Sequence, residues 1–165
     1  GLERYENSAE HSWHVCLSAL MLKDYSNEPI NIDRVIKMLL IHDLGEIDTG
    51  DTIIYASETK ELKEKEEAGL RRVLNILPEG KTDQYLSLWR EFELGESVDA
   101  KYAKAIDRVP PLLHNLNGNG HSWKDNNVPK EKVFALNSRI AKGSTELWDV
   151  LKGKLDKAVV DGILK

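Results

Sequence analysis

The residues best suited to chemistry follow a largely apolar run, residues 35–41. His42 and Asp43 come directly after this run, and two further carboxylates, Glu46 and Asp51, follow at short spacing. Burying an imidazole together with several carboxylates is costly unless a metal ion or a proton compensates their charge. The segment therefore predicts a buried site for a divalent metal ion or for proton transfer.

Two residues far away in the sequence complete a set of metal ligands. His11 and Asp107 each lie in a segment with helical periodicity whose neighbours predict burial. Alone, His11 would be read as a hydrogen-bonded core histidine, and Asp107 as the partner of a nearby cation such as Arg108. With His42 and Asp43 they provide two imidazoles and two carboxylates, a set that suits a borderline divalent ion. Helices distant in sequence bring such side chains together in a bundle core.

Helical periodicity dominates the chain, and no convincing alternating strand pattern is present, so we expect an all-α bundle. The first helix begins after a capping box, Asn7 with Glu10, and is apolar on nearly all faces, which predicts a buried helix. On a later, highly charged helix, Lys63 and Glu66 are expected to face solvent, with a position facing the pocket as the alternative. The expected helices cover about residues 7–25, 32–44, 57–77, 82–94, 97 to the prolines at 110–111, and 144 to near the C-terminus.

Two segments are expected to be loops. Residues 45–57 are rich in acids and glycine, and residues 117–129 form the longest loop-like stretch. In or beside the second loop, Asn115, His121 and Trp123 are candidates for contacts to a base or sugar, with a plain surface loop as the alternative.

The bulk properties restrict the class of protein. With 165 residues the chain is long enough for one domain, residues 1–165, with a sizeable core. A net charge of -5 and a pI near 5.6 argue against binding to a nucleic-acid polymer. No run approaches ~18 apolar residues, so no membrane span is expected. The single cysteine, Cys16, excludes an internal disulfide and fits a cytoplasmic location.

The ordered set of motifs resembles a known family. Its segments are Glu10-His11-Ser12-Trp13, Ile41-His42-Asp43-Leu44-Gly45-Glu46, Thr49-Gly50-Asp51 and Ala105-Ile106-Asp107-Arg108. Their order and spacing are similar to those of the HD-domain metal-dependent phosphohydrolases, and among these to the small 5'-deoxynucleotidase-like branch. The resemblance extends from about residue 3 to the C-terminus, and it implies an all-α HD-domain helical bundle with a buried metal site.

The resemblance also implies roles for individual residues. One divalent ion (Mn, Co, Fe, Ni, Zn or Mg) would be bound by His11, His42, Asp43 and Asp107. Glu46 would act as the base for the attacking water, and Asp51 would orient that water or protonate the leaving oxygen. The reaction would be hydrolysis of a small phosphorylated substrate, with a (deoxy)nucleoside 5'-monophosphate favoured.

The substrate-binding side of the resemblance is less complete. The branch carries an Arg-Trp pair upstream of its first histidine, and that position would precede Gly1. Arg4 is the candidate phosphate clamp in this chain, with an exposed terminal arginine as the alternative. His14 lies off the face of His11 on the expected helix, so we expect it to be a neighbour of the site or a core residue.

Other functions remain open at this stage. A metal-binding helical scaffold or regulatory domain would keep the four ligands without requiring Glu46 and Asp51. A di-iron oxygenase of the HD type would need additional histidines between Leu44 and Ile106, where the sequence has none. Phosphodiesterases of the HD type for cyclic dinucleotides carry a Gly-Tyr-Pro signature that is absent here. A homodimer is a further open possibility.

Overall fold

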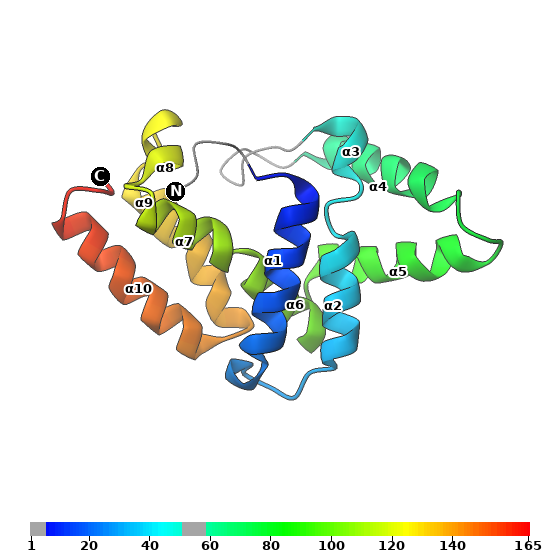
Figure 1. Ribbon diagram of the computed structural model, residues 1–165, viewed down its shortest axis with the longest axis horizontal. Helices are drawn as coiled ribbons and strands as arrows, with labels where there is room; N and C mark the ends of the chain where they lie inside the picture. The colour runs from blue at the N-terminus through cyan, green and yellow to red at the C-terminus, as the bar shows by residue number, and fades with distance from the viewer. Residues whose placement is uncertain (1–5, 51–58) are drawn as a thin grey trace.

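The computed structural model describes residues 6–50 and 59–165, and this part of the chain is built from helices with no strand (Figure 1). The all-α prediction is confirmed. The elements are α1 (Ser8–Met21), η1 (Lys23–Tyr25), α2 (Ile32–Ile41), α3 (Glu46–Thr49), α4 (Lys60–Leu74), α5 (Lys81–Leu94), α6 (Val98–Asp107), α7 (Val109–Asn117), α8 (His121–Asp125), α9 (Lys130–Asn137), η2 (Ser138–Lys142) and α10 (Thr145–Val160), where η marks a 3-10 helix.

The start of α1 follows the predicted capping box. The Asn7 side chain accepts hydrogen bonds from the backbone N–H groups of Ala9 and Glu10, both at 3.1 Å. The Glu10 carboxylate in turn accepts from the backbone N–H of Asn7 at 3.3 Å. These bonds satisfy the free donors at the beginning of the helix and fix where it starts.

The helices enclose two clusters of buried apolar side chains. One cluster joins α1, α2, α4, α5 and α6, and the other joins the end of α6 to α7, α8, α9, η2 and α10. In Figure 1, α1, α2 and α6 lie alongside one another in the middle, with α4 and α5 on one side and α7 to α10 on the other. A buried hydrogen bond connects α6 to α1: the Tyr102 hydroxyl donates to the Ala19 carbonyl at 3.0 Å.

The expectation that α1 is buried nearly all round is wrong. Trp13 is 67% exposed, and Leu17, Leu20 and Met21 continue the exposed apolar stripe along the same helix. The opposite side, with Val15 and Ala19, packs into the core. Hydrophobic periodicity identifies apolar faces but does not tell which of them the fold itself covers.

The expectation that Glu66 faces solvent is also wrong, because it is 6% exposed. Lys63 neutralises it: the Lys63 Nζ lies 2.9 Å from Glu66 and 2.8 Å from Glu93 on α5. Burial lowers the pKa of Lys63, but its hydrogen bonds to Glu93 and Glu66 outweigh burial and raise that pKa. The charged sequence of α4 predicted an exposed face, whereas part of that face forms a buried ion-pair network with α5.

The second predicted loop is partly helical. It contains α8, and Trp123 within α8 is only 2% exposed, so the predicted contact of Trp123 with a base is wrong. The Asn115 side chain accepts a hydrogen bond from the Trp123 backbone N–H at 3.3 Å, which is a structural contact. His121 is exposed and lies 3.2 Å from Asp125. Within the described residues, no helix is long and apolar enough to cross a membrane.

Candidate functional site

Three helices bring the predicted metal ligands to one place. His11 lies on the first turns of α1, His42 directly follows the last residue of α2, and Asp107 is the last residue of α6. The Trp89 indole N–H donates to the His42 backbone carbonyl at 3.0 Å and so fixes the end of α2. Asp43 follows in the turn that leads to α3.

The four side chains face one another at short distances. The Nε2 atoms of His11 and His42 lie 3.1 Å and 3.2 Å from the same oxygen, Oδ1 of Asp107. Asp43 also contacts both rings, with Oδ1 at 3.0 Å from His42 Nε2 and Oδ2 at 4.0 Å from His11 Nε2. The structure thus brings together all four residues that the sequence singled out.

The outer nitrogens of the two imidazoles show how the rings are oriented. His42 Nδ1 lies 2.7 Å from the Leu39 carbonyl, which only accepts hydrogen bonds, so this nitrogen carries the proton and donates it. His11 Nδ1 lies 3.3 Å from the Glu6 carboxylate, an equivalent acceptor. In the neutral ring this leaves Nε2 with a free lone pair directed at the cluster. Such a bond from the outer nitrogen is typical of metal-binding histidines.

Without a metal ion, protons take over the charge compensation. Burial lowers the pKa of His11, but the hydrogen bond to Asp107 and the charges of Asp107 and Asp43 outweigh it and raise that pKa. The same partners raise the pKa of His42 well above its ordinary value despite burial. Burial raises the pKa of Asp107, yet its bonds to both histidines lower it far below the usual range. An anionic site that attracts protons so strongly also suits a divalent cation.

The predicted catalytic residues lie beside this cluster or outside the described residues. Glu46 is the first residue of α3 and half-buried, and its backbone N–H donates to the Asp43 carbonyl at 3.0 Å. Arg72 on α4 holds α3 in place through two hydrogen bonds to Asp48, at 2.8 Å and 2.6 Å. Asp51 and Arg4 fall outside the described residues.

Two neighbours of the site were missed from sequence. Glu6 precedes the capping residue Asn7, and its position five residues before His11 gave no helical signal. Phe92 packs edge-on against the His42 ring at 5.3 Å between centroids and shields it from solvent. His14, expected beside the site or in the core, is 37% exposed at its side chain and lies next to Glu6.

The chain is similar to several known proteins. The sequence profile described as "HD domain" matches residues 1–148. A human protein named 5'-deoxynucleotidase HDDC2 is 29% identical over 113 residues, which cover 68% of this chain and 54% of that protein. A 5'-deoxynucleotidase from Vibrio cholerae is 31% identical over 129 residues, covering 72% of this chain and 66% of the relative. The chain thus spans about half the length of the human relative.

A solved structure supports the same grouping. The protein described as a predicted metal-dependent phosphohydrolase from Magnetospirillum magnetotacticum is 42% identical in sequence and superposes with a TM-score of 0.93. The match covers 98% of this chain and 82% of that one. The matched profile and this solved relative both extend over the helices that carry His11, His42, Asp43 and Asp107, and the chain belongs to the HD domain family.

Proposed function

We propose that this chain is a metal-dependent phosphohydrolase that removes phosphate from a small phosphorylated substrate, with a deoxynucleoside 5'-monophosphate favoured. The observation that carries the proposal is the pair of histidines whose outer nitrogens are occupied and whose Nε2 atoms converge on Asp107. The choice of substrate rests on the relatives named 5'-deoxynucleotidase.

His11, His42, Asp43 and Asp107 are the residues we assign to one divalent ion. A bound ion of this kind lowers the pKa of a water molecule and polarises phosphoryl oxygens. These four residues can bind Mn, Co, Fe, Ni, Zn or Mg. Which of these ions occupies the site depends on availability as well as affinity.

The remaining residues are assigned to the movement of protons and to substrate binding. Glu46 accepts a proton from the water that attacks phosphorus, and the bond between phosphorus and the sugar oxygen breaks. Asp51 orients the water or supplies the proton that the leaving alcohol needs, so that the products are an alcohol and inorganic phosphate. Arg4 is our candidate for binding the phosphate group before the reaction.

A substrate panel tests this proposal. Metal-free protein is loaded separately with each candidate ion, and phosphate release is measured on ribo- and deoxyribonucleoside 5'-monophosphates and on other phosphate esters. We expect release from the nucleotides, and its loss together with metal binding in His42→Ala and Asp43→Ala. Normal metal binding without hydrolysis of any ester would favour a metal-binding scaffold instead.

Three further proposals concern the whole protein. We propose one HD domain over residues 1–165, because Leu147 packs against both core clusters, and we expect a single cooperative unfolding transition.

We propose a homodimer through the exposed apolar stripe of α1. Analytical ultracentrifugation of Trp13→Glu and of the wild type tests this proposal. A cytoplasmic location is consistent with the free thiol of Cys16, whose pKa burial raises to about 11, and fractionation of cells tests it.

A further inference from the structure

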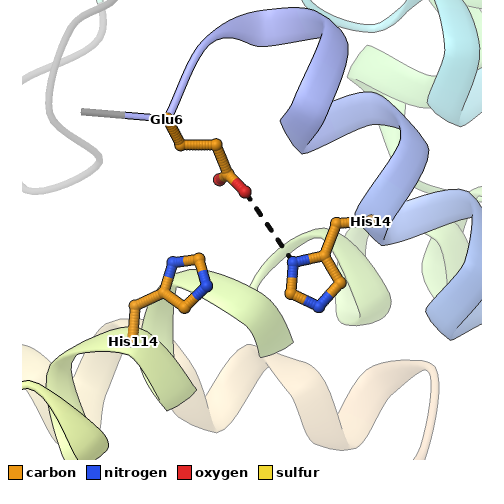
Figure 2. Close-up of side chains that lie close together, drawn as sticks. All are labelled: Glu6, His14 and His114. Carbon is orange, nitrogen blue, oxygen red and sulfur yellow. Dashed lines mark ion pairs between the residues drawn. The ribbon is translucent and has the colours of Figure 1, made fainter. Parts of the chain in front are cut away.

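A second group of metal-binding side chains lies beside the first. Glu6 before α1, His14 on α1 and His114 on α7 each direct one donor atom into a common space, and the three atoms lie within 4.8 Å of one another. Figure 2 shows the two imidazole rings facing each other, with the Glu6 carboxylate turned towards them. None of these residues belongs to the set of His11, His42, Asp43 and Asp107.

The group has the composition of a metal site. Two imidazoles and one carboxylate form a common three-ligand set for zinc, which leaves a further position for water. Ligands of a tetrahedral zinc ion lie about 3.3–3.4 Å apart, given bonds of about 2.0–2.1 Å. Rotation of these side chains would close the remaining gap, since they are held loosely: Glu6 and His14 are 28% and 37% exposed, and His114 is exposed.

The contacts within the group leave its ligand atoms available to bind an ion. Glu6 Oε1 lies 3.8 Å from His14 Nδ1, beyond hydrogen-bond distance. The rings of His14 and His114 are tilted by 39° with their centroids 5.6 Å apart, which is a loose contact rather than a tight stack. An ion between them would replace these long contacts with direct bonds.

Glu6 connects the two groups. Its Oε2 atom lies 3.3 Å from His11 Nδ1, while Oε1 faces His14. A ligand bound through Oε1 therefore affects the carboxylate that orients His11. Such a shared residue couples the affinities of two sites, and the coupling is reciprocal.

We propose that Glu6, His14 and His114 form a second binding site for a divalent transition-metal ion such as Zn²⁺ or Co²⁺. Imidazole ligands favour these ions over Mg²⁺ and Ca²⁺. With three ligands, all at least partly exposed, the site binds its ion more weakly than the cluster of four residues. This proposal goes beyond the proposed function, because it requires neither phosphate chemistry nor an ion in the first site.

Calorimetric titration of the full, metal-free chain with Co²⁺ tests the proposal. We expect two classes of site in the wild type. His114→Ala and His14→Gln lose the weaker class by at least about tenfold in affinity and keep the tighter one. His42→Ala shows the reverse, and Glu6→Gln weakens both. His121→Ala is the matched control, since this exposed histidine belongs to neither group, and it keeps both classes.

A second readout identifies the residues directly. In NMR spectra of His42→Ala, where the first site is absent, paramagnetic Co²⁺ should shift the imidazole proton resonances of His14 and His114. A wild type that lacks the weaker class of site, or unchanged weaker binding in His114→Ala and His14→Gln, would overturn the proposal. Loss of the tighter class alone, or absence of phosphate release, bears on the proposed function and leaves the second site standing.

Discussion

Glu46 lies four residues after His42, at the start of α3, and the proposed reaction assigns it the proton of the attacking water. Replacing its carboxylate with an amide in Glu46→Gln keeps the size of the side chain but removes the base. We expect turnover to fall about 10²–10⁴-fold with metal affinity nearly unchanged. Steady-state phosphate release and a metal titration of the same sample measure both quantities. Turnover at the wild-type level would remove Glu46 from the mechanism.

The raised pKa values of His11 and His42 in the metal-free protein predict how metal binding depends on pH. Both rings bind protons more tightly in the folded than in the unfolded chain, whose histidines have a pKa near 6.5. The protonated pair therefore stabilises the metal-free fold below that value, and the stabilisation is lost as pH rises through the raised pKa values.

A metal ion must displace these protons, so its apparent affinity should rise with pH up to the raised pKa values of the two rings and level off above them. Calorimetry at several pH values measures the affinity, and NMR titration of the imidazole protons in metal-free protein measures the pKa values. Affinity that stays constant over this range would show that the two rings are already neutral.

The sequence predicted the inner residues of the site better than their surroundings. His11, His42, Asp43 and Asp107 stood out because each is a polar group in an apolar helical pattern. Glu6 and His114 carry no such signal, because both are surface residues brought together by the packing of α1 against α7. Glu66 was misjudged because its burial depends on the packing of α4 against α5, which the sequence does not show. Its partner Lys63 also pairs with Glu93 on α5.

At the level of elements, the close contact of α3 and α4 positions Glu46. Gly45 precedes α3, and a Cβ atom there would lie 2.6 Å from the Glu66 carbonyl oxygen. Gly45→Ala therefore forces α3 away from α4, at a cost of about 1–3 kcal/mol in stability. We expect turnover to fall as well, because Glu46 moves with α3. Thermal unfolding and phosphate release measure the two effects.

Gly153 provides the matched control for this substitution. It lies inside α10, and an added Cβ meets no atom within 4 Å. Gly153→Ala should raise stability by up to about 1 kcal/mol through helix propensity and leave turnover unchanged. Equal effects of the two substitutions would contradict the role of the α3–α4 contact.

The sequence located most of the long helices, because capping residues and periodic apolar positions are local signals. As expected, α1, α6 and α10 begin directly after the capping residues Asn7, Ser97 and Ser144. The short elements α3 and α8 lay in segments predicted as loops, because helices of one turn have too few positions for periodicity. The exposed stripe on α1 was misread as core because sequence alone does not reveal which apolar face remains uncovered.

For the whole molecule, metal binding should be linked to stability. The metal site joins α1, α2 and α6, which come together only in the folded chain. An ion at about 100 times its dissociation constant should therefore stabilise the fold by about 2.7 kcal/mol. Thermal unfolding with and without metal measures this, and His42→Ala should show a much smaller shift.

The most direct test of the central claim is phosphate release measured while Co²⁺ is added stepwise to metal-free protein. The account predicts that hydrolysis of a deoxynucleoside 5'-monophosphate rises to a plateau at one equivalent, as the four-residue site fills first. Ions bound beyond the first equivalent, at Glu6, His14 and His114, add no activity. A plateau only at two equivalents, or no phosphate release although the first equivalent binds, would contradict the claim that one ion at His11, His42, Asp43 and Asp107 supports phosphohydrolysis.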